Sequence, residues 1–293
     1  MIGRSAAMRD LGRFVRRVAR TSLPVLIRGE TGSGKELVAR ALHELGPRRG
    51  KPLVVINAAM IVGDLGASQL FGHATGAFTG ATTPRRGAFR EAHQGALFLD
   101  ELGALPIESQ AKLLRVLEDG VVSPIGSDMP IKVDVRVLAA TCEPLERRVA
   151  EGTFRRDLFE RLSVCTVAVP SLEERREDIP ELARWMLACS EFSGLSLSPR
   201  ALSVLQMCEL PGNVRGLRNI LIQSALSCAG ETIEAEDVLR ALGHRSVPQP
   251  PRPPLDSLSA HALLHECSGN QSDAARRAQL PRSTFRDLLR KTG

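Results

Sequence analysis

The chain has 293 residues, a formal net charge of +6, and ordinary globular proportions of 43% hydrophobic and 25% charged residues. That length suffices for about two domains, and no apolar run approaches the roughly 18 residues that a membrane-spanning helix needs. The first residues lack the apolar centre of a secretion signal, and the six cysteines form no Cys-x-x-Cys pair. These features argue against a disulfide framework and a cysteine zinc site and favour a cytoplasmic protein. The positive charge hints at an acidic partner.

Residues 1–170 are predicted to form an α/β domain with a parallel sheet. Short apolar runs bounded by glycine, proline or polar residues are typical of strands that are buried on both faces. Helical patterns separate these runs, for example at 36–45 and 108–117. Alternation of strand and helix at this spacing favours parallel pairing. The strands are predicted at 24–28, 53–57, 96–100 and 135–140.

The rest of the chain divides into three further parts. Residues 171–243 carry helical patterns only, at 178–188, 198–208 and 214–229, and are predicted to form a small helical subdomain. Residues 244–255 are predicted to be a stiff, extended linker, because five prolines within 247–254 are incompatible with a helix or a central strand. Residues 256–293 are predicted to be helical again, and they become basic near the end.

A glycine-rich segment follows the first predicted strand and opens the helix that starts at Glu36. Its glycines let backbone N–H groups converge on phosphate, the helix N-terminus adds partial positive charge, and Lys35 reaches the terminal phosphates. A chance glycine-rich turn would not require the strand, the lysine and the helix in this order. Glu36 stands where the general motif has a Ser or Thr that holds magnesium, so either the site is defective or a particular ATPase family is present. The predicted nucleotide-binding residues are Gly29, Glu30, Thr31, Gly32, Ser33, Gly34, Lys35 and Glu36.

Two carboxylates end the third predicted strand. Asp100 is placed to hold magnesium, directly or through water, and Glu101 is placed to orient and deprotonate an attacking water. Two acids that simply leave a buried strand at the solvent edge are the alternative. The phosphate loop upstream makes the catalytic interpretation stronger.

A hexapeptide, Gly76-Ala77-Phe78-Thr79-Gly80-Ala81, reads GAFTGA and resembles the signature loop of the sigma-54-dependent activators, or bacterial enhancer-binding proteins, within the AAA+ class. The stretches at 70–73, 110–117 and 130–136 also resemble that family, whose phosphate loop has the form GESGTGKE with a glutamate at the position of Glu36. The resemblance runs from Ile2 to about Leu242. It implies an AAA+ P-loop ATPase with a helical lid that uses ATP and Mg²⁺, forms a ring, expected to be a hexamer, and acts on sigma-54 RNA polymerase holoenzyme.

The GAFTGA segment has a physical logic as a contact loop. Gly76 and Gly80 permit unusual backbone angles, so Phe78 and Thr79 are expected in solvent between them. By resemblance, all six residues form the sigma-54 contact, with Phe78 and Thr79 pressing on the factor in the ATP-bound state. The segment at 121–132 resembles the second surface loop of the family, which assists the first.

Other roles carry over from the resemblance alone. Arg155 and Arg161 match the arginine fingers, which a neighbouring subunit supplies to stabilise charge on the transferring phosphoryl group. Arg215 matches the sensor II arginine of the lid, and Asn57 matches the asparagine that holds the catalytic glutamate until sigma is contacted. Thr141, at the end of the sensor I strand, is expected at the nucleotide.

The sequence departs from the family pattern at several positions. Cys142 replaces the usual sensor I asparagine and lacks the amide that this asparagine offers to the γ-phosphate or water. Leu210 and Gly216 replace Trp and Glu in the lid motif WPGNVREL, and Gln69 stands where an acid is usual. These changes place the rate of hydrolysis in question more than ATP binding or the sigma contact.

The C-terminal segment resembles the Fis-type helix-turn-helix domain that ends members of this family. A short helix is predicted at 270–280, a turn at Leu280-Pro281, and a second, arginine-rich helix at 282–291. A helix at 255–267 is expected to dimerise, and a solvated helical tail is the alternative for the whole segment. Residues expected to contact double-stranded enhancer DNA are Arg282, Ser283, Thr284 and Arg286.

The sequence therefore predicts an ATP-dependent activator that converts the sigma-54 polymerase closed complex to an open complex while bound to upstream DNA. A DNA-binding regulator with weak or lost hydrolysis is the second hypothesis, because of Cys142. A remodeller of a non-transcriptional target is a third, which GAFTGA and the helix-turn-helix disfavour. Most relatives carry a regulatory domain before the ATPase, so either a separate regulatory partner or a shortened gene product is expected.

Overall fold

The computed structural model describes residues 2–243 and 270–271. The proline-rich linker expected at 244–255 and the DNA-binding residues expected at 282–286 lie outside the described residues. The same holds for the helix expected at 255–267.

The core of the predicted α/β domain, residues 1–170, is a five-stranded sheet in which every pairing is parallel, with the order β2-β3-β6-β1-β7. This confirms the predicted parallel α/β class. The four predicted strands exist within one residue of their expected bounds, and a fifth, β7, was missed because its alternating three-residue pattern is too short to stand out. The strands are β1 Val25–Arg28, β2 Leu53–Asn57, β3 Ala96–Asp100, β6 Arg136–Thr141 and β7 Thr166–Ala168.

Alternate residues of the central strands point to opposite faces of the sheet, and both faces are covered. Val25 and Ile27 belong to one core cluster together with residues of α1 and α2. Leu26, between them, belongs to the other cluster, which contains residues of α3, α5 and α7. This two-sided burial explains why the strands read as continuous apolar runs.

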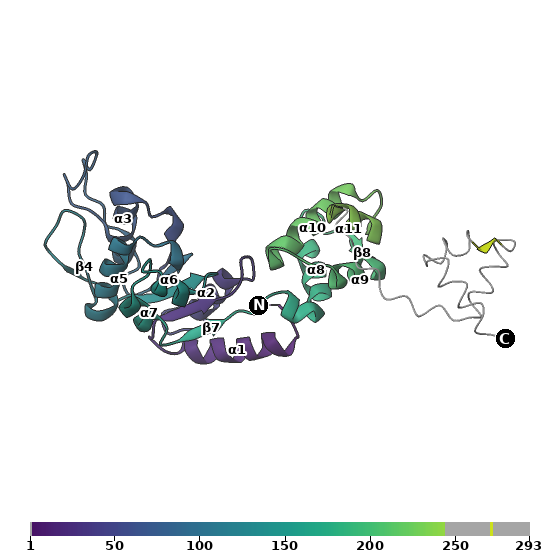
Figure 1. The fold of residues 1–293 in the computed structure, drawn as a ribbon, viewed down its shortest axis with the longest axis horizontal. Coiled ribbons are helices and arrows are strands. Elements are labelled where there is room, and N and C mark those ends of the chain that lie inside the picture. Colours follow the sequence, from purple (N-terminus) through teal and green to yellow (C-terminus); the bar gives the residue numbers. More distant parts are fainter. Residues whose placement is uncertain (1, 244–269, 272–293) are drawn as a thin grey trace. The chain divides into compact units, whose positions relative to one another are not determined.

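Helices on both faces carry the sheet's connections. α1 begins at the N-cap Ser5, whose side chain accepts from the Met8 backbone N–H, and it lies beside β7 (Figure 1). At its other end, the buried Arg136 guanidinium donates to the carbonyls of Val18 and Ala19 at 2.8 and 3.0 Å. The helices are α1 Ala6–Ala19, α2 Lys35–Glu44, α3 Gly63–Phe71, α4 Ala88–Glu91, α5 Ile107–Asp119, α6 Leu145–Ala150 and α7 Arg156–Leu162, with the 3-10 turns η1 Ala58–Met60 and η2 Leu102–Ala104.

The lid part is a helical cluster with its own apolar core, visible in Figure 1 as the group α8 to α11. A short parallel ladder, β8 Ser196–Leu197 with β9 Thr232–Ile233, was not predicted, because two-residue strands leave no periodic signal. The helices are η3 Glu173–Asp178, α8 Ile179–Ala188, α9 Pro199–Met207, α10 Asn213–Ser227 and α11 Ala235–Ala241. Within the described part of the chain, no helix combines the length and apolar character required to cross a bilayer.

Candidate nucleotide site and contact loop

Parallel pairing places the predicted site residues along one edge of the sheet. The carboxyl ends of β2, β3, β6 and β1 follow one another in that order, and they carry Asn57, Asp100, Thr141 and Arg28 respectively. The phosphate loop leaves β1 directly after Arg28. Residues from four distant sequence segments therefore meet at the end of the sheet where ligands of open α/β folds bind.

The phosphate loop has the geometry that an anion requires. Gly32 and Gly34 adopt φ values of +74° and +110°, which favour glycine, and a Cβ added at Gly34 would meet open space. Gly34 is also the N-cap of α2 and supplies no side-chain cap, so N–H groups of the first turn are available to a phosphate. Lys35 is 6% exposed, and its Nζ donates to the carbonyls of Gly29 and Glu30 at 2.9 and 3.1 Å. The residues present thus fit a nucleotide phosphate.

The two acids differ in environment. Burial raises the pKa of Asp100, and the positive charge of Lys35 acts in the opposite direction. Glu101 has φ +52°, a left-handed conformation that is costly for a residue with a Cβ and is common at functional sites. The Cys142 thiol contacts Glu101 Oε2 at 3.4 Å. The acid expected to act as a base therefore contacts the residue that follows the neighbouring strand β6.

Two predicted site residues have local roles in the structure. Asn57 Oδ1 accepts from the Ala59 backbone N–H at 2.9 Å and caps η1. Thr141 is 1% exposed, and its hydroxyl bonds to the backbone N–H and carbonyl of Glu143 at 3.0 and 3.2 Å. The hydroxyl of Thr141 is therefore engaged in the turn that presents Cys142, and the contact partner of Glu101 is Cys142 rather than the expected Asn57.

The three predicted arginines lie on two different parts of the chain. Arg155 precedes α7 and pairs with Asp157 through two bonds of 3.1 and 2.7 Å, and Arg161 donates to the Leu117 carbonyl at 3.1 Å. Arg155 is thus bonded within the start of α7, whereas Arg161 is bonded to the neighbouring helix α5. Arg215 lies on α10 next to the phosphate loop, since a Cβ at Gly32 would approach its Cβ to 3.0 Å. The structure thus brings Arg215 to the phosphate loop, whereas Arg155 and Arg161 contact residues of α5 and α7.

The GAFTGA segment forms a tight loop between two glycines with positive φ. Gly76 and Gly80 have φ values of +81° and +95°, and the loop closes through a Gly76 N–H to Ala81 carbonyl bond of 2.8 Å. Thr79 is exposed as predicted. The prediction that Phe78 also lies in solvent is wrong, because its ring packs on the His73 imidazole with centroids 4.9 Å apart and is half-buried.

His73 anchors the base of this loop. Its ring nitrogens bond to the Ser68 hydroxyl at 2.7 Å and the Thr83 carbonyl at 2.9 Å. Its backbone pairs with Arg85, and the next residue, Ala74, donates to the carbonyl of Ile125 in the second loop at 2.9 Å. The stretch at 70–73 was noted in the sequence only as part of the family resemblance. Its histidine could have been recognised as a loop anchor only from these long-range contacts.

The segment at 121–132 is an antiparallel hairpin arm that packs on the GAFTGA loop. It contains β4 Val121–Val122 and β5 Ile131–Lys132, which pair with each other. A Cβ at Gly126, which has φ +71°, would clash with the Ala77 Cβ at 2.7 Å. The two predicted surface loops therefore meet where Gly126 contacts Ala77, and a side chain at position 126 would not fit there.

Family models match nearly the whole described part of the chain. The sigma-54 interaction domain model matches residues 1–168, and the AAA+ ATPase lid domain model matches residues 173–253. The chain belongs to the sigma-54 interaction domain family of AAA+ proteins. The fold, the phosphate loop and the GAFTGA loop described above are consistent with this assignment.

Curated relatives extend the assignment along the chain. The DNA-binding transcriptional regulator NtrC of Salmonella typhimurium is 48% identical over 255 residues, which cover 86% of this chain and 54% of that protein. NtrC of Escherichia coli K12 is 40% identical over 328 residues, covering 100% of this chain and 70% of that protein. This member of the family spans about half of the length of the Salmonella relative.

Solved structures show the same architecture. NtrX from Brucella abortus, determined in complex with ADP and in complex with ATP, superposes with a TM-score of 0.77 at 35% identity over 99% of this chain and 69% of that protein. The RuvB branch migration motor of Thermotoga maritima superposes with a TM-score of 0.56 at 14% identity, covering 99% of this chain and 86% of that protein, and shares the fold alone.

Proposed function

We propose that this chain is an ATPase that uses hydrolysis to open the closed complex of sigma-54 RNA polymerase while bound to upstream double-stranded DNA. Two features of one domain carry the proposal. A phosphate loop leads into α2, whose N-terminus has no side-chain cap, and it lies at the same sheet edge as Asp100 and Glu101. A GAFTGA loop flanked by two glycines with positive φ exposes Thr79. Membership of the sigma-54 interaction domain family supports it. The NtrX structures with ADP and ATP support a nucleotide as the ligand.

The residues at the sheet edge divide the chemistry among them. Lys35 and the first-turn N–H groups of α2 bind and orient the phosphates. Asp100 would hold the magnesium ion, which would neutralise charge on the phosphates. Burial raises the pKa of Asp100, and a cation bound beside this carboxylate would lower that pKa again. Glu101 accepts the proton of the attacking water when it turns away from the Cys142 thiol.

Assembly completes the site in this proposal. Arg155 and Arg161 are exposed residues at either end of α7, and the present partners of their side chains, a surface carboxylate and a carbonyl, are exchangeable with water. In a ring, expected to be a hexamer, these guanidinium groups would reach the phosphates bound by the neighbouring subunit. Arg215 would contact them from the lid of the same subunit.

The deciding experiment measures two activities of the purified 293-residue chain. ATP turnover tests the proposed hydrolysis, and open-complex formation on a sigma-54 promoter with the holoenzyme tests the proposed action on the polymerase. We expect both, with opening dependent on hydrolysable ATP. Turnover without promoter opening would refute the polymerase target, and absence of turnover under conditions that support nucleotide binding would favour the DNA-binding regulator with lost hydrolysis.

A further inference from the structure

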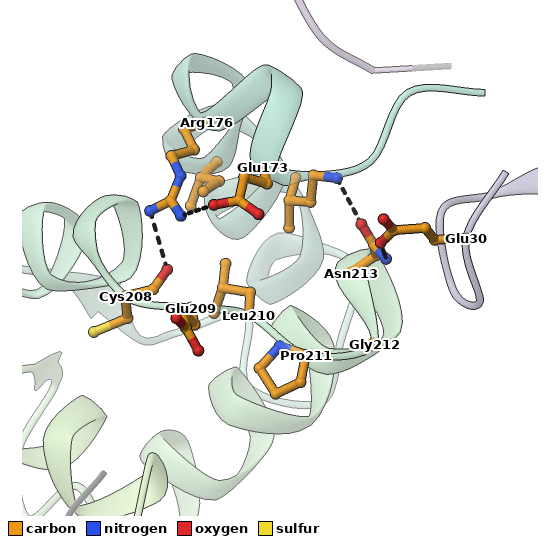
Figure 2. Close-up of a pocket in the computed structure, with 11 residues that line it drawn as sticks. Glu30, Glu173, Arg176, Cys208, Glu209, Leu210, Pro211, Gly212 and Asn213 are labelled. Atoms are coloured by element: carbon orange, nitrogen blue, oxygen red, sulfur yellow. Dashed lines mark hydrogen bonds and ion pairs between the residues drawn. The ribbon is translucent and has the colours of Figure 1, made fainter. Parts of the chain in front are cut away.

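One buried side chain of the lid is bonded to the outer side of the phosphate loop. Asn213 begins α10, is 5% exposed and adopts φ +55°, which is uncommon for a residue other than glycine. Its Nδ2 donates to Glu30 Oε2 at 2.9 Å and to the Thr31 carbonyl at 3.1 Å, while its Oδ1 accepts from the Leu172 N–H at 2.6 Å. Figure 2 shows the Asn213 amide between Glu30 and the segment that enters the lid. A single amide therefore joins three segments of the chain.

Neighbouring groups of the lid bond to the rest of the same loop. The Val214 N–H donates to the Gly32 carbonyl at 3.1 Å, and the buried Arg175 guanidinium donates to the Ser33 carbonyl at 2.9 Å. Together with Asn213, these groups contact each of the four consecutive residues 30–33. The backbones meet so closely that a Cβ at Gly32 would lie 2.1 Å from the Gly212 carbonyl oxygen. This dense contact is not explained by packing alone, because it consists of directed hydrogen bonds to one loop.

The peptide groups of this loop have two sides. In a phosphate loop the N–H groups converge on the anion, so the carbonyls of the same peptide groups face away from it. Here the outward carbonyls of Thr31, Gly32 and Ser33 are the acceptors for the lid. The lid is therefore bonded to the carbonyl side of the loop, so a change in the loop on phosphate binding would reach these hydrogen bonds.

The carboxylate of Glu30 needs a fixed position near such a loop. A negative charge that approached the phosphates would oppose binding of the nucleotide. The bond from Asn213 Nδ2 holds this carboxylate on the lid side, at the wall of the small cavity that Glu30, Asn213, Glu173 and Arg176 help to line (Figure 2). The same bond orients the start of α10, which carries Arg215 two residues later.

We propose that Asn213 is a positioning residue of the nucleotide site, which couples the phosphate loop to the lid through Glu30 and Thr31. The inference rests on the proposed ATPase function and adds to it a residue that the sequence analysis did not single out. Loss of the Asn213 donor weakens nucleotide binding and displaces Arg215, whereas Lys35, Asp100 and Glu101 remain in place. The effect is therefore larger on nucleotide affinity and KM than on kcat.

The test uses the 293-residue chain and replaces the hydrogen-bond donor at position 213 with an acceptor. Asn213→Asp keeps the shape, tolerates positive φ and still accepts from Leu172, but it replaces the donor to Glu30 with a second acid. We expect the Kd for ATP to rise about tenfold, the size of effect that one or two lost bonds to a charged and a neutral acceptor produce. In the double variant Asn213→Asp with Glu30→Gln, the glutamine amide donates to the new carboxylate, and we expect at least half of the lost affinity, on a logarithmic scale, to return.

Controls separate positioning from a general loss of structure. Asn219→Asp changes an exposed residue of the same helix α10 and is expected to bind ATP like the wild type. Glu30→Gln alone is measured to complete the cycle, with an expected loss of about twofold, because an amide oxygen is a weaker acceptor than a carboxylate. Rescue by the second substitution and a larger change in KM than in kcat are results that destabilisation alone does not produce.

The outcomes are distinguishable. Wild-type affinity in Asn213→Asp, or a folded double variant with no recovery, overturns the role of Asn213 and leaves the proposed ATPase intact. A wild-type chain that binds no ATP overturns the proposed function and this inference together. Should Asn213→Asp fail to fold, Asn213→Gly, which tolerates the positive φ and removes the amide, is measured instead. A loss of about threefold supports the inference, and unchanged affinity overturns it.

Discussion

The phosphate loop and the GAFTGA loop are both glycine-rich turns, yet the structure holds them in opposite ways. Residues 30–33 of the phosphate loop are each bonded by the lid, and Lys35 binds two carbonyls at the start of the same loop. The GAFTGA loop is closed by a backbone hydrogen bond between Gly76 and Ala81, and the Phe78 ring packs on the His73 imidazole. Added Cβ atoms at Gly76 and Gly80 would meet nothing.

This difference matches the two tasks. A loop that binds a small ligand of fixed shape gains affinity from preorganisation, because less conformational freedom is lost on binding. A loop that contacts a partner in only one nucleotide state must be free to change its position, and such segments come from the less stable parts of a fold. Substitutions in the phosphate site should therefore change ATP turnover, whereas substitutions in the GAFTGA loop should change promoter opening and leave ATP turnover intact.

The largest effect is expected from the arginines that, in our proposal, complete the nucleotide site in a ring. Arg161→Ala should lower ATP turnover by about 10³-fold, as for other arginine fingers, because charge on the transferring phosphoryl group loses its partner. Specific activity of the wild type should rise with protein concentration as rings assemble. Arg156→Ala, at the exposed arginine that begins the same helix α7, is the matched control. Full activity in Arg161→Ala, or wild-type activity independent of concentration, would contradict a role in trans.

The second effect concerns the base. Glu101→Gln should bind ATP and turn it over about 100-fold more slowly, because an amide cannot accept the proton of water. Glu108→Gln, on the exposed side of the nearby helix α5, should behave like the wild type. Steady-state turnover and nucleotide affinity are measured on the same preparations. Near-wild-type turnover in Glu101→Gln would show that another group is the base.

The GAFTGA loop should respond in the opposite way. Thr79→Ala should lower open-complex formation on a sigma-54 promoter at least tenfold, the scale expected for one lost contact at the centre of an interface. Its ATP turnover should remain close to that of the wild type, because the loop has no part in the phosphate chemistry. Phe78→Ala should show the same pattern, and Thr75→Ala, exposed just before the loop, should retain both activities. Promoter opening at the wild-type rate in Thr79→Ala would remove the assignment of the loop.

The smallest effect is expected at Cys142, whose thiol contacts Glu101 in the nucleotide site. Cys142→Asn should raise turnover about fivefold, because the amide adds one hydrogen bond to the phosphate or the attacking water. Cys142→Ser, which supplies a hydroxyl to Glu101 without an amide, should remain near the wild-type rate. A fall in turnover in Cys142→Asn would show instead that the thiol contact at 3.4 Å is part of the working site.

Much of the nucleotide site was predictable because its signals are local. The strand before Gly29, the glycines and the helix after Lys35 adjoin in sequence, and the structure shows them as β1, the loop and α2. The four longer strands were recognisable because burial on both faces makes them continuously apolar. Strands of two or three residues, such as β7 and β8, carry no comparable signal and form only because a longer strand or a partner segment lies beside them.

The sequence by itself determined the parallel α/β class, the phosphate loop and the presence of a glycine-flanked GAFTGA segment. The tertiary structure alone decided that Phe78 rests on His73, that Cys142 rather than Asn57 contacts Glu101, and that Asn213 bonds to Glu30. The physical reason is that glycine conformation and apolar periodicity act over a few residues, whereas Asn213 and Glu30 are separated by 183 positions in the chain. Their contact exists only after the sheet and the lid have packed, and no pattern within either segment encodes the distance between them.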